Sequence, residues 1–197
     1  MIYKKNKLKI DGFNVNYLAK KYKTPIYCYS LRKIKNNIES LKRNFKKINP
    51  LICYAVKANT NLSILKEIKN YNLGADVVSI GELKKALKAG ISPKKIVFSG
   101  VGKTFEEIEY AVSKNILLIN AESKSEILVI EKIAKKKTKI VNIGIRLNPN
   151  IDAQTLSQIS TGKKENKFGV DQKIFLQLVD QVKKSRFLNL KCLSIHI

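Results

Sequence analysis

Short apolar runs alternate with amphipathic segments along most of this chain, and the alternation limits the fold more than any other feature. The predicted strands are 25–29, 51–56, 74–79, 95–99, 116–120, 139–148 and 190–197. The predicted helices are 31–46, 62–70, 81–89, 104–114, 123–136 and 171–185. Strands that are apolar on both faces and alternate with helices are typical of a parallel α/β sheet.

Helix boundaries are marked by capping residues. Ser30, Thr104 and Ser123 stand where an N-cap is expected, because each can accept a hydrogen bond from the first turn. Gly74 and Gly90 follow predicted helix ends, where a left-handed residue is common. The caps therefore support the predicted helices.

The spacing of the predicted strands leaves two architectures open. From residue 51 each strand and its helix take about 20 residues through four units, and the last unit takes about 50. That last unit contains a polar insertion, 149–169, which is too long for an idle connection. A doubly wound open sheet and an eight-stranded barrel both fit this spacing.

Polar residues at the carboxyl ends of the strands favour the barrel. They are Lys57, Asp76, Ser79, Ser99, Asn120, Arg146, Asn148 and His196. In a barrel these ends converge on one mouth, whereas an open sheet spreads them along an edge. We therefore predict a (β/α)8 barrel, incomplete with about six strands, and expect the chain to be a piece of a longer protein.

The net charge of +24 raises the question of nucleic-acid binding. Of the 39 basic residues only four are arginine, at positions 32, 43, 146 and 186. Nucleic-acid surfaces favour arginine, which can pair with two acceptors and stack. A solvated lysine-rich surface is thus preferred over a functional basic patch, and we expect no nucleic-acid partner.

Cysteine spacing and hydropathy exclude two further classes. The three cysteines, Cys28, Cys53 and Cys192, lie far apart without metal-ligand spacing. We expect small apolar side chains in a reducing compartment and no metal site. No apolar stretch reaches 18 residues, and the first 25 contain no signal-like apolar segment. These features predict a cytoplasmic protein without a membrane partner.

The segment "SGVGKT", 99–104, superficially resembles a phosphate-binding loop. The phosphate-loop pattern requires glycine at position 97, which is Val97 here, inside a predicted strand. The segment is therefore predicted to be an ordinary turn between a strand and a helix.

Two residues stand out as candidates for chemistry. Lys57 follows the apolar run "ICYAV", and a lysine desolvated at a buried strand end can lose its proton and act as a nucleophile. His196, the only histidine, follows the last predicted strand. A strand histidine that is hydrogen-bonded to the backbone explains His196 equally well.

Seven segments together resemble one known family, the diaminopimelate decarboxylases. They are "DGFNVNYLAKKYKTPIYCYS" (11–30), "YAVKAN" (54–59), "GADVVSIGEL" (74–83), "IVFSGVGKT" (96–104), "RLNPNIDAQT" (146–155), "ISTGKKENKFGV" (159–170) and "SIHI" (194–197). "YAVKAN" is shared with the wider group of ornithine and arginine decarboxylases. The segments within 146–170 point to diaminopimelate.

The resemblance implies a fold, a cofactor and site residues. Residues 1–30 would belong to the family's β domain, and 31–197 to a barrel that binds pyridoxal 5'-phosphate. By this resemblance Lys57 binds the cofactor aldehyde as a Schiff base, and His196 stacks on the cofactor ring. Asp76 and Arg146 would be polar residues around the cofactor.

The resemblance also implies an activity. It is the decarboxylation of meso-2,6-diaminopimelate to L-lysine and carbon dioxide, the last step of lysine biosynthesis, by a homodimer. We expect the chain as given to be inactive alone. Two alternatives stay open: an ornithine- or arginine-type decarboxylase of the same fold, and a non-catalytic barrel protein that binds pyridoxal phosphate.

Overall fold

The computed structural model describes residues 2–4, 6–151 and 168–196. Most of the predicted insertion 149–169 lies outside the described residues. The chain divides into two compact units, Met1–Pro50 and Leu51–Ile197. The domain boundary expected after residue 30 stays a prediction. In the structure, helix α2 (Leu31–Asn44), which follows residue 30, is part of the first unit.

The first unit contains a small antiparallel sheet and two helices. The sheet has the order β1 (Ile2–Lys4), β2 (Lys7–Ile10) and β3 (Phe13–Asn14). The helices are α1 (Val15–Tyr22) and α2 (Leu31–Asn44). The sequence analysis missed these strands and α1, because the strands are very short and rich in lysine and asparagine.

The run 25–29, predicted to be a strand, connects α1 to α2 without strand pairing. That prediction was wrong. Pro25 cannot donate to a ladder, and among the described residues this run pairs with no strand. The predicted N-cap at Ser30 is confirmed by a 3.0 Å hydrogen bond from Lys33 N. The Ser30 hydroxyl also donates to Asp11, which lowers the pKa of that carboxyl.

The second unit is built on one parallel sheet whose strands follow one another in sequence order. They are β4 (Cys53–Ala55), β5 (Gly74–Val77), β6 (Ile96–Phe98), β7 (Leu118–Ala121), β8 (Val141–Leu147) and β9 (Leu188–Ile195). A doubly wound sheet reverses its strand order part-way, and this sheet does not. The order therefore decides for the barrel-type winding over the open sheet.

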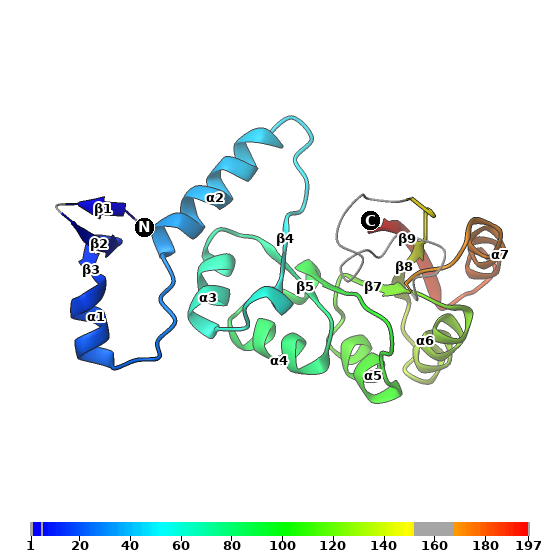
Figure 1. Ribbon diagram of the computed structural model, residues 1–197. Coiled ribbons are helices and arrows are strands. Elements are labelled where there is room, and N and C mark those ends of the chain that lie inside the picture. Colours follow the sequence, from blue (N-terminus) through cyan, green and yellow to red (C-terminus); the bar gives the residue numbers. More distant parts are fainter. Residues whose placement is uncertain (1, 5, 152–167, 197) are drawn as a thin grey trace. The chain divides into compact units, whose positions relative to one another are not determined.

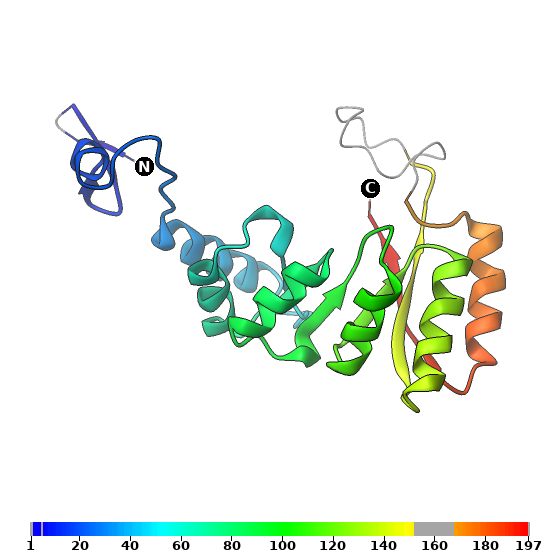
Figure 2. The same ribbon diagram turned by 90° about the horizontal axis from the view of Figure 1, so that it is seen from below.

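Helices connect these strands along one face of the sheet (Figures 1 and 2). They are α3 (Leu62–Asn70), α4 (Ile80–Lys88), α5 (Phe105–Ser113), α6 (Lys124–Lys136) and α7 (Gln172–Lys183), with short 3-10 turns η1 (Val56–Ala58) and η2 (Pro93–Lys95). Helix side chains such as Leu83, Ile108 and Ile130 are fully buried, as is Phe98 of β6. Because the helices cover this face, the other face is left for polar residues.

Three successive helices begin with the same capping pattern, which also ties neighbouring loops together. The pairs are Ser79 and Glu82, Thr104 and Glu107, and Ser123 and Glu126. In each pair the hydroxyl accepts from the backbone N–H of the glutamate. Glu107 also accepts from Ile80 N of the preceding helix at 2.8 Å. The loops that carry the strand ends are thus fixed to one another.

The glycine predictions at helix ends differ in outcome. Gly90 follows α4 with φ of +88°, as predicted. Gly74 is instead the first residue of β5, and Asn72, with φ of +61°, takes the left-handed position after α3. A Cβ at position 74 would collide with Lys95 O and come within 2.7 Å of Cys53 Sγ. Gly74 is therefore required by close packing of strands and not by a turn.

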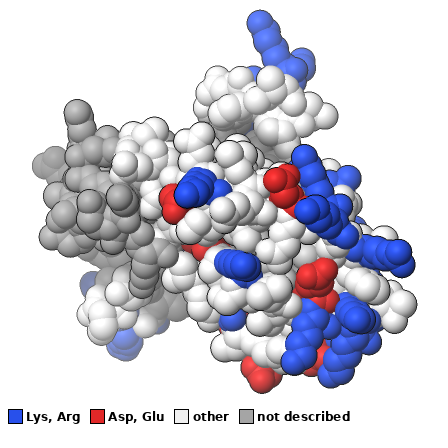
Figure 3. All heavy atoms as spheres, turned by 90° about the vertical axis from the view of Figure 1, so that its right-hand side faces the viewer, with Lys and Arg blue, Asp and Glu red and all other residues white. Residues whose placement is uncertain are grey.

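The basic residues do not form one continuous patch on the face drawn in Figure 3. Lysine and arginine side chains there lie in separate groups, most of them with acidic side chains beside them. This face therefore agrees with a solvated lysine-rich surface, while the absence of a nucleic-acid partner stays a prediction. No helix in the described part of the chain is both long and apolar enough to span a bilayer.

Candidate functional site

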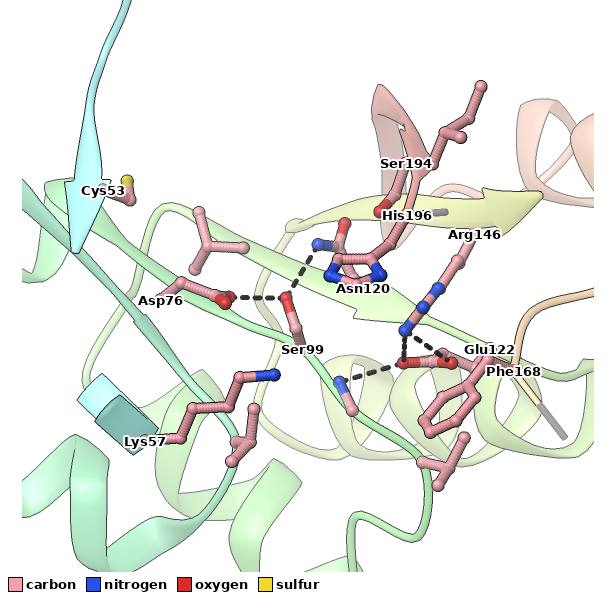
Figure 4. Close-up of a pocket in the computed structure, with 15 residues that line it drawn as sticks. Cys53, Lys57, Asp76, Ser99, Asn120, Glu122, Arg146, Phe168, Ser194 and His196 are labelled. Carbon is pink, nitrogen blue, oxygen red and sulfur yellow. Dashed lines mark hydrogen bonds and ion pairs between the residues drawn. The ribbon is translucent and has the colours of Figure 1, made fainter. Parts of the chain in front are cut away.

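The carboxyl ends of the six parallel strands open into one cavity of about 550 Å³ (Figure 4). Six of the polar residues expected at strand ends line it: Lys57, Asp76, Ser99, Asn120, Arg146 and His196. Ser79 and Asn148 do not line this cavity; Ser79 instead caps α4. Each of the six strands therefore contributes one of the predicted polar residues to the same cavity.

Lys57 lies on the 3-10 turn η1, two residues beyond the end of β4. Its side chain extends into the cavity, toward Asp76 and Ser99 (Figure 4). The residue is exposed among the described residues, whereas the sequence suggested a buried strand end. That expectation was wrong because β4 ends at Ala55, and the buried residue of the turn is Val56. The amine is thus open to a ligand in the cavity.

Asp76, Ser99 and Asn120 form a hydrogen-bonded row across three neighbouring strand ends. The Ser99 hydroxyl donates to Asp76 Oδ1 at 2.6 Å, and Asn120 Nδ2 donates to Ser99 Oγ at 3.0 Å. Burial raises the pKa of the Asp76 carboxyl, while the hydrogen bond from Ser99 and the charge of Lys57 oppose the rise. The cavity therefore holds a carboxylate whose charged form is disfavoured by burial and supported by its neighbours.

This raised pKa predicts how replacing Asp76 by asparagine changes stability with pH. The folded state binds the Asp76 proton more tightly than the unfolded state does, because its pKa is raised above the ordinary value of 3.8. The stability gained from this proton is complete at pH values below 3.8 and is lost as the pH rises through the folded-state pKa. Asparagine has no charge to bury. In the full-length protein, the Tm of Asp76→Asn minus that of wild type should therefore increase from pH 4 to pH 7. Thermal unfolding across this range measures it.

Asp180→Asn, on the exposed side of α7, is the control for the loss of one negative charge. A Tm difference for Asp76→Asn that stays constant or shrinks with rising pH would contradict the prediction.

Arg146 of β8 is buried and paired with a carboxylate that the sequence analysis did not select. Its Nη1 lies 3.1 Å from Glu122 Oε1, and both side chains are at most 10% exposed. Glu122 also accepts from the backbone N–H groups of Gly100 and Gly169. The guanidinium packs on the Phe168 ring at 4.9 Å. Arg146 thus lines the cavity with its positive charge largely neutralised.

His196 follows β9 and is placed at the mouth of the cavity beside Arg146 (Figure 4). Burial lowers the pKa of the imidazole, and the positive charges of Arg146 and Lys57 lower it further. The neutral ring is therefore favoured at neutral pH. A neutral imidazole can pack against a flat ligand without the cost of burying a charge.

The turn "SGVGKT" binds within the protein. The Lys103 side chain is 1% exposed, and its ammonium lies 2.6 Å from Glu126 Oε1. It also donates to the backbone carbonyls of Gly100 and Asn120. With its donors engaged by two loops, Lys103 has no role of the phosphate-loop type, in agreement with the sequence-based prediction.

Glu122 and Phe168 line the cavity and were missed by the sequence analysis. Glu122 directly follows β7, so it stands at a strand end as Asn120 does. It also directly precedes the helix cap at Ser123, and the sequence did not show whether Glu122 belongs to the cavity or to the start of the helix. Phe168 comes from a segment far along the chain.

The described residues contain no group of histidine, cysteine or acidic side chains that could hold a metal ion. The three cysteines are free and half-buried.

Comparison with known proteins identifies the family. A family model described as pyridoxal-dependent decarboxylase, pyridoxal binding domain, matches residues 31–197. The chain belongs to this family. The pyridoxal-dependent decarboxylases are thus the group that the strand-end lysine and the motifs suggested.

Individual relatives point in the same direction. A diaminopimelate decarboxylase of Helicobacter pylori is 53% identical over 185 residues, covering 94% of this chain and 46% of that protein. One of Aquifex aeolicus is 42% identical over 194 residues, covering 98% and 45%. The chain therefore spans about half the length of the curated relatives it matches.

Solved structures agree with the fold. The diaminopimelate decarboxylase of Helicobacter pylori complexed with L-lysine has a TM-score of 0.91 at 51% identity, covering 93% of this chain and 47% of that one. The M. jannaschii enzyme in complex with L-lysine has a TM-score of 0.91 at 37% identity, covering 98% and 46%. The predicted barrel is confirmed as an incomplete one, of which the described residues form six parallel strands.

The cavity of this pyridoxal-binding domain suits the cofactor of its family. An aldehyde cofactor needs a primary amine that is open to it, and Lys57 provides one at the cavity wall. A flat ring needs apolar and neutral surfaces, and His196 and Val78 also line the cavity. The residues present therefore fit pyridoxal phosphate.

Proposed function

We propose that the full-length protein converts meso-2,6-diaminopimelate to L-lysine and carbon dioxide, with pyridoxal 5'-phosphate held on Lys57. The observation that carries this proposal is the Lys57 amine, which opens into a cavity at the carboxyl ends of the strands in a pyridoxal-binding domain. Relatives at 42% to 53% identity that bear the name diaminopimelate decarboxylase support the choice of substrate.

In this proposal Lys57 and Asp76 act on the amine chemistry. The Lys57 amine would hold the cofactor through its aldehyde, the same group that would react with the substrate amine. The Asp76 carboxylate lies close enough for its charge to interact with that of Lys57, so it stabilises the positive form of the nitrogen. Lys57 is the catalytic residue and Asp76 a cofactor-site residue.

His196 and Arg146 are proposed to line the cofactor ring. The neutral imidazole of His196 would pack on one face of the ring and exclude water from it. Arg146 keeps this wall in place through Glu122 and Phe168, and its remaining positive charge faces the same cavity. Both residues therefore shape the cofactor site.

When bound, pyridoxal phosphate supplies a carbonyl that condenses with amines and a conjugated ring that accepts an electron pair. The α-carboxylate of the substrate leaves as carbon dioxide, and a proton replaces it on the α-carbon. A site that keeps water from this carboxylate would favour the transition state, in which the negative charge has begun to disperse.

The organisation of the whole protein is part of the same proposal. Residues 1–30 would contribute to a second, β-rich domain, and the antiparallel sheet β1 to β3 supports this. We also propose a homodimer in the cytoplasm, in keeping with the family resemblance.

The test combines covalent trapping with a substrate comparison. Borohydride reduction of the full-length protein loaded with pyridoxal phosphate, followed by peptide mass analysis, should place the cofactor on Lys57. Carbon dioxide release should be at least about 100-fold faster from meso-diaminopimelate than from ornithine or arginine, because a site built for the distal polar groups rejects substrates that leave them unpaired.

Each alternative has its own outcome in this test. Trapping on Lys57 with faster release from ornithine or arginine would point to the other decarboxylase type. Trapping without carbon dioxide release from any of the three would point to a non-catalytic binding protein. A cofactor adduct on another lysine would overturn the proposal itself.

A further inference from the structure

We propose that Ser99 and Asn120 are positioning residues that act in series on Asp76, holding its carboxylate in one orientation beside the Lys57 amine. The inference rests on the proposed role of Lys57 as the residue that carries the cofactor. It adds a function for two residues that line the same cavity.

The direction of the hydrogen bonds in this row is fixed by chemistry. An ionised carboxylate only accepts, so the single hydroxyl proton of Ser99 must point to Asp76 Oδ1, 2.6 Å away. The lone pairs of Ser99 are then left to accept from Asn120 Nδ2 at 3.0 Å. Ser99 thus has one arrangement that satisfies both neighbours, and the hydrogen bond from Asn120 holds the hydroxyl oxygen in it.

Asn120 is itself held firmly. The residue is 7% exposed, and its backbone carbonyl accepts from the buried ammonium of Lys103 at 2.7 Å. Its side-chain oxygen packs directly over Gly144 of the next strand, where the Cβ of any other residue would collide with it. The absence of a side chain at Gly144 therefore makes room for the amide.

The Asn120 side chain also carries an unusual cost. Its Oδ1 is buried and has no hydrogen-bond partner among the described residues. A buried acceptor without a partner costs about 1–3 kcal/mol. An apolar residue would avoid this cost in a barrel interior. The retained amide is thus explained by its one good contact, the hydrogen bond to Ser99.

Several charged or titratable groups face Asp76, so the effect of Ser99 must be separated from theirs. These groups are Lys57 on η1, Cys53 on β4, Arg146 on β8 and His196 after β9. The positive groups and the Ser99 hydrogen bond all lower the pKa of Asp76, whereas burial raises it. Of these contributions, only the Ser99 hydrogen bond also fixes the direction of a carboxylate oxygen.

The first experiment is a pH titration of the cofactor absorbance in the full-length holoenzyme. An oriented, ionised carboxylate beside the Lys57 nitrogen favours the positively charged form of its link to the cofactor. Ser99→Ala should therefore move the absorbance midpoint to lower pH by about one unit, a tenfold change in proton affinity. Ser99→Thr, which keeps the hydroxyl, should restore the wild-type midpoint.

A double-mutant cycle tests the serial arrangement. Asn120→Ala should shift the midpoint in the same direction by less, and Ser99→Ala/Asn120→Ala should match Ser99→Ala alone, because Asn120 acts only through Ser99. Gly144→Ala, which displaces the amide without removing a polar group, should behave as Asn120→Ala does. Ser113→Ala, which removes the hydroxyl of a serine on α5 outside the cavity, is the matched control.

The outcomes separate this inference from the proposed function. An unchanged midpoint in Ser99→Ala, with the cofactor still trapped on Lys57, would overturn the positioning role and leave the proposed function intact. Additive shifts in the double variant would overturn the serial arrangement. Failure to trap the cofactor on Lys57 in the wild-type protein would overturn the proposed function first.

Discussion

Replacing Lys57 by alanine is expected to lower kcat/KM for meso-diaminopimelate by at least about 1000-fold in the full-length protein, because the nucleophilic amine and its covalent link are lost together. Because Lys57 is exposed, its replacement should leave the rest of the cavity wall unchanged. The Tm should therefore stay close to wild type. Steady-state carbon dioxide release and thermal unfolding of the same preparations measure the two effects.

Lys66→Ala provides the matched control for Lys57. Lys66 is an exposed lysine on α3 that does not line the cavity. Its replacement should leave kcat/KM within about twofold of wild type, as expected for a surface residue outside the site. Retained activity in Lys57→Ala would exclude the proposed chemistry.

Replacing Glu122 by alanine is expected to lower the free energy of unfolding by about 3–5 kcal/mol, the cost of leaving one partner of a buried ion pair alone. The Arg146 guanidinium, 8% exposed, would lose its carboxylate, and Gly100 N and Gly169 N would lose an acceptor. Chemical denaturation of the full-length protein, monitored by circular dichroism, measures the change.

Glu109 offers the comparison for Glu122. It also pairs with basic side chains, Lys136 at 3.4 Å and Lys137 at 3.3 Å, but on the surface. Ion pairs on the surface contribute little to stability, so Glu109→Ala should have a much smaller effect than Glu122→Ala. Equal losses from the two variants would mean that the burial of the Arg146 pair contributes nothing.

The repeating strand and helix units were predictable because their signal is local. Each helix of the second unit begins and ends within about two residues of its predicted position, since capping residues and apolar periodicity act over one or two turns. The convergence of Lys57, Asp76, Arg146 and His196 followed from a rule of parallel sheets, which places the carboxyl ends of the strands at one edge.

Other features depend on contacts that the local pattern does not encode. Glu122 is one of several acidic residues near helix starts, and only the fold brings it to Arg146, 24 residues away. Lys103 is one of many lysines, and its burial arises from the meeting of two loops. The exposure of Lys57 depended on where β4 ends, and strand ends are poorly defined by periodicity.

The glutamates that cap one helix and reach the preceding loop have a consequence for engineering this site. Glu107 accepts hydrogen bonds from the start of α4 and from the start of α5. Glu126 accepts a hydrogen bond from the ammonium of Lys103, which lies in the turn before α5. Varying one of these loops in a combinatorial library therefore disturbs the neighbouring loop. Loops that are not neighbours share no glutamate in these contacts. Adjacent loops should be randomised in pairs, with the shared glutamate retained as the fixed position.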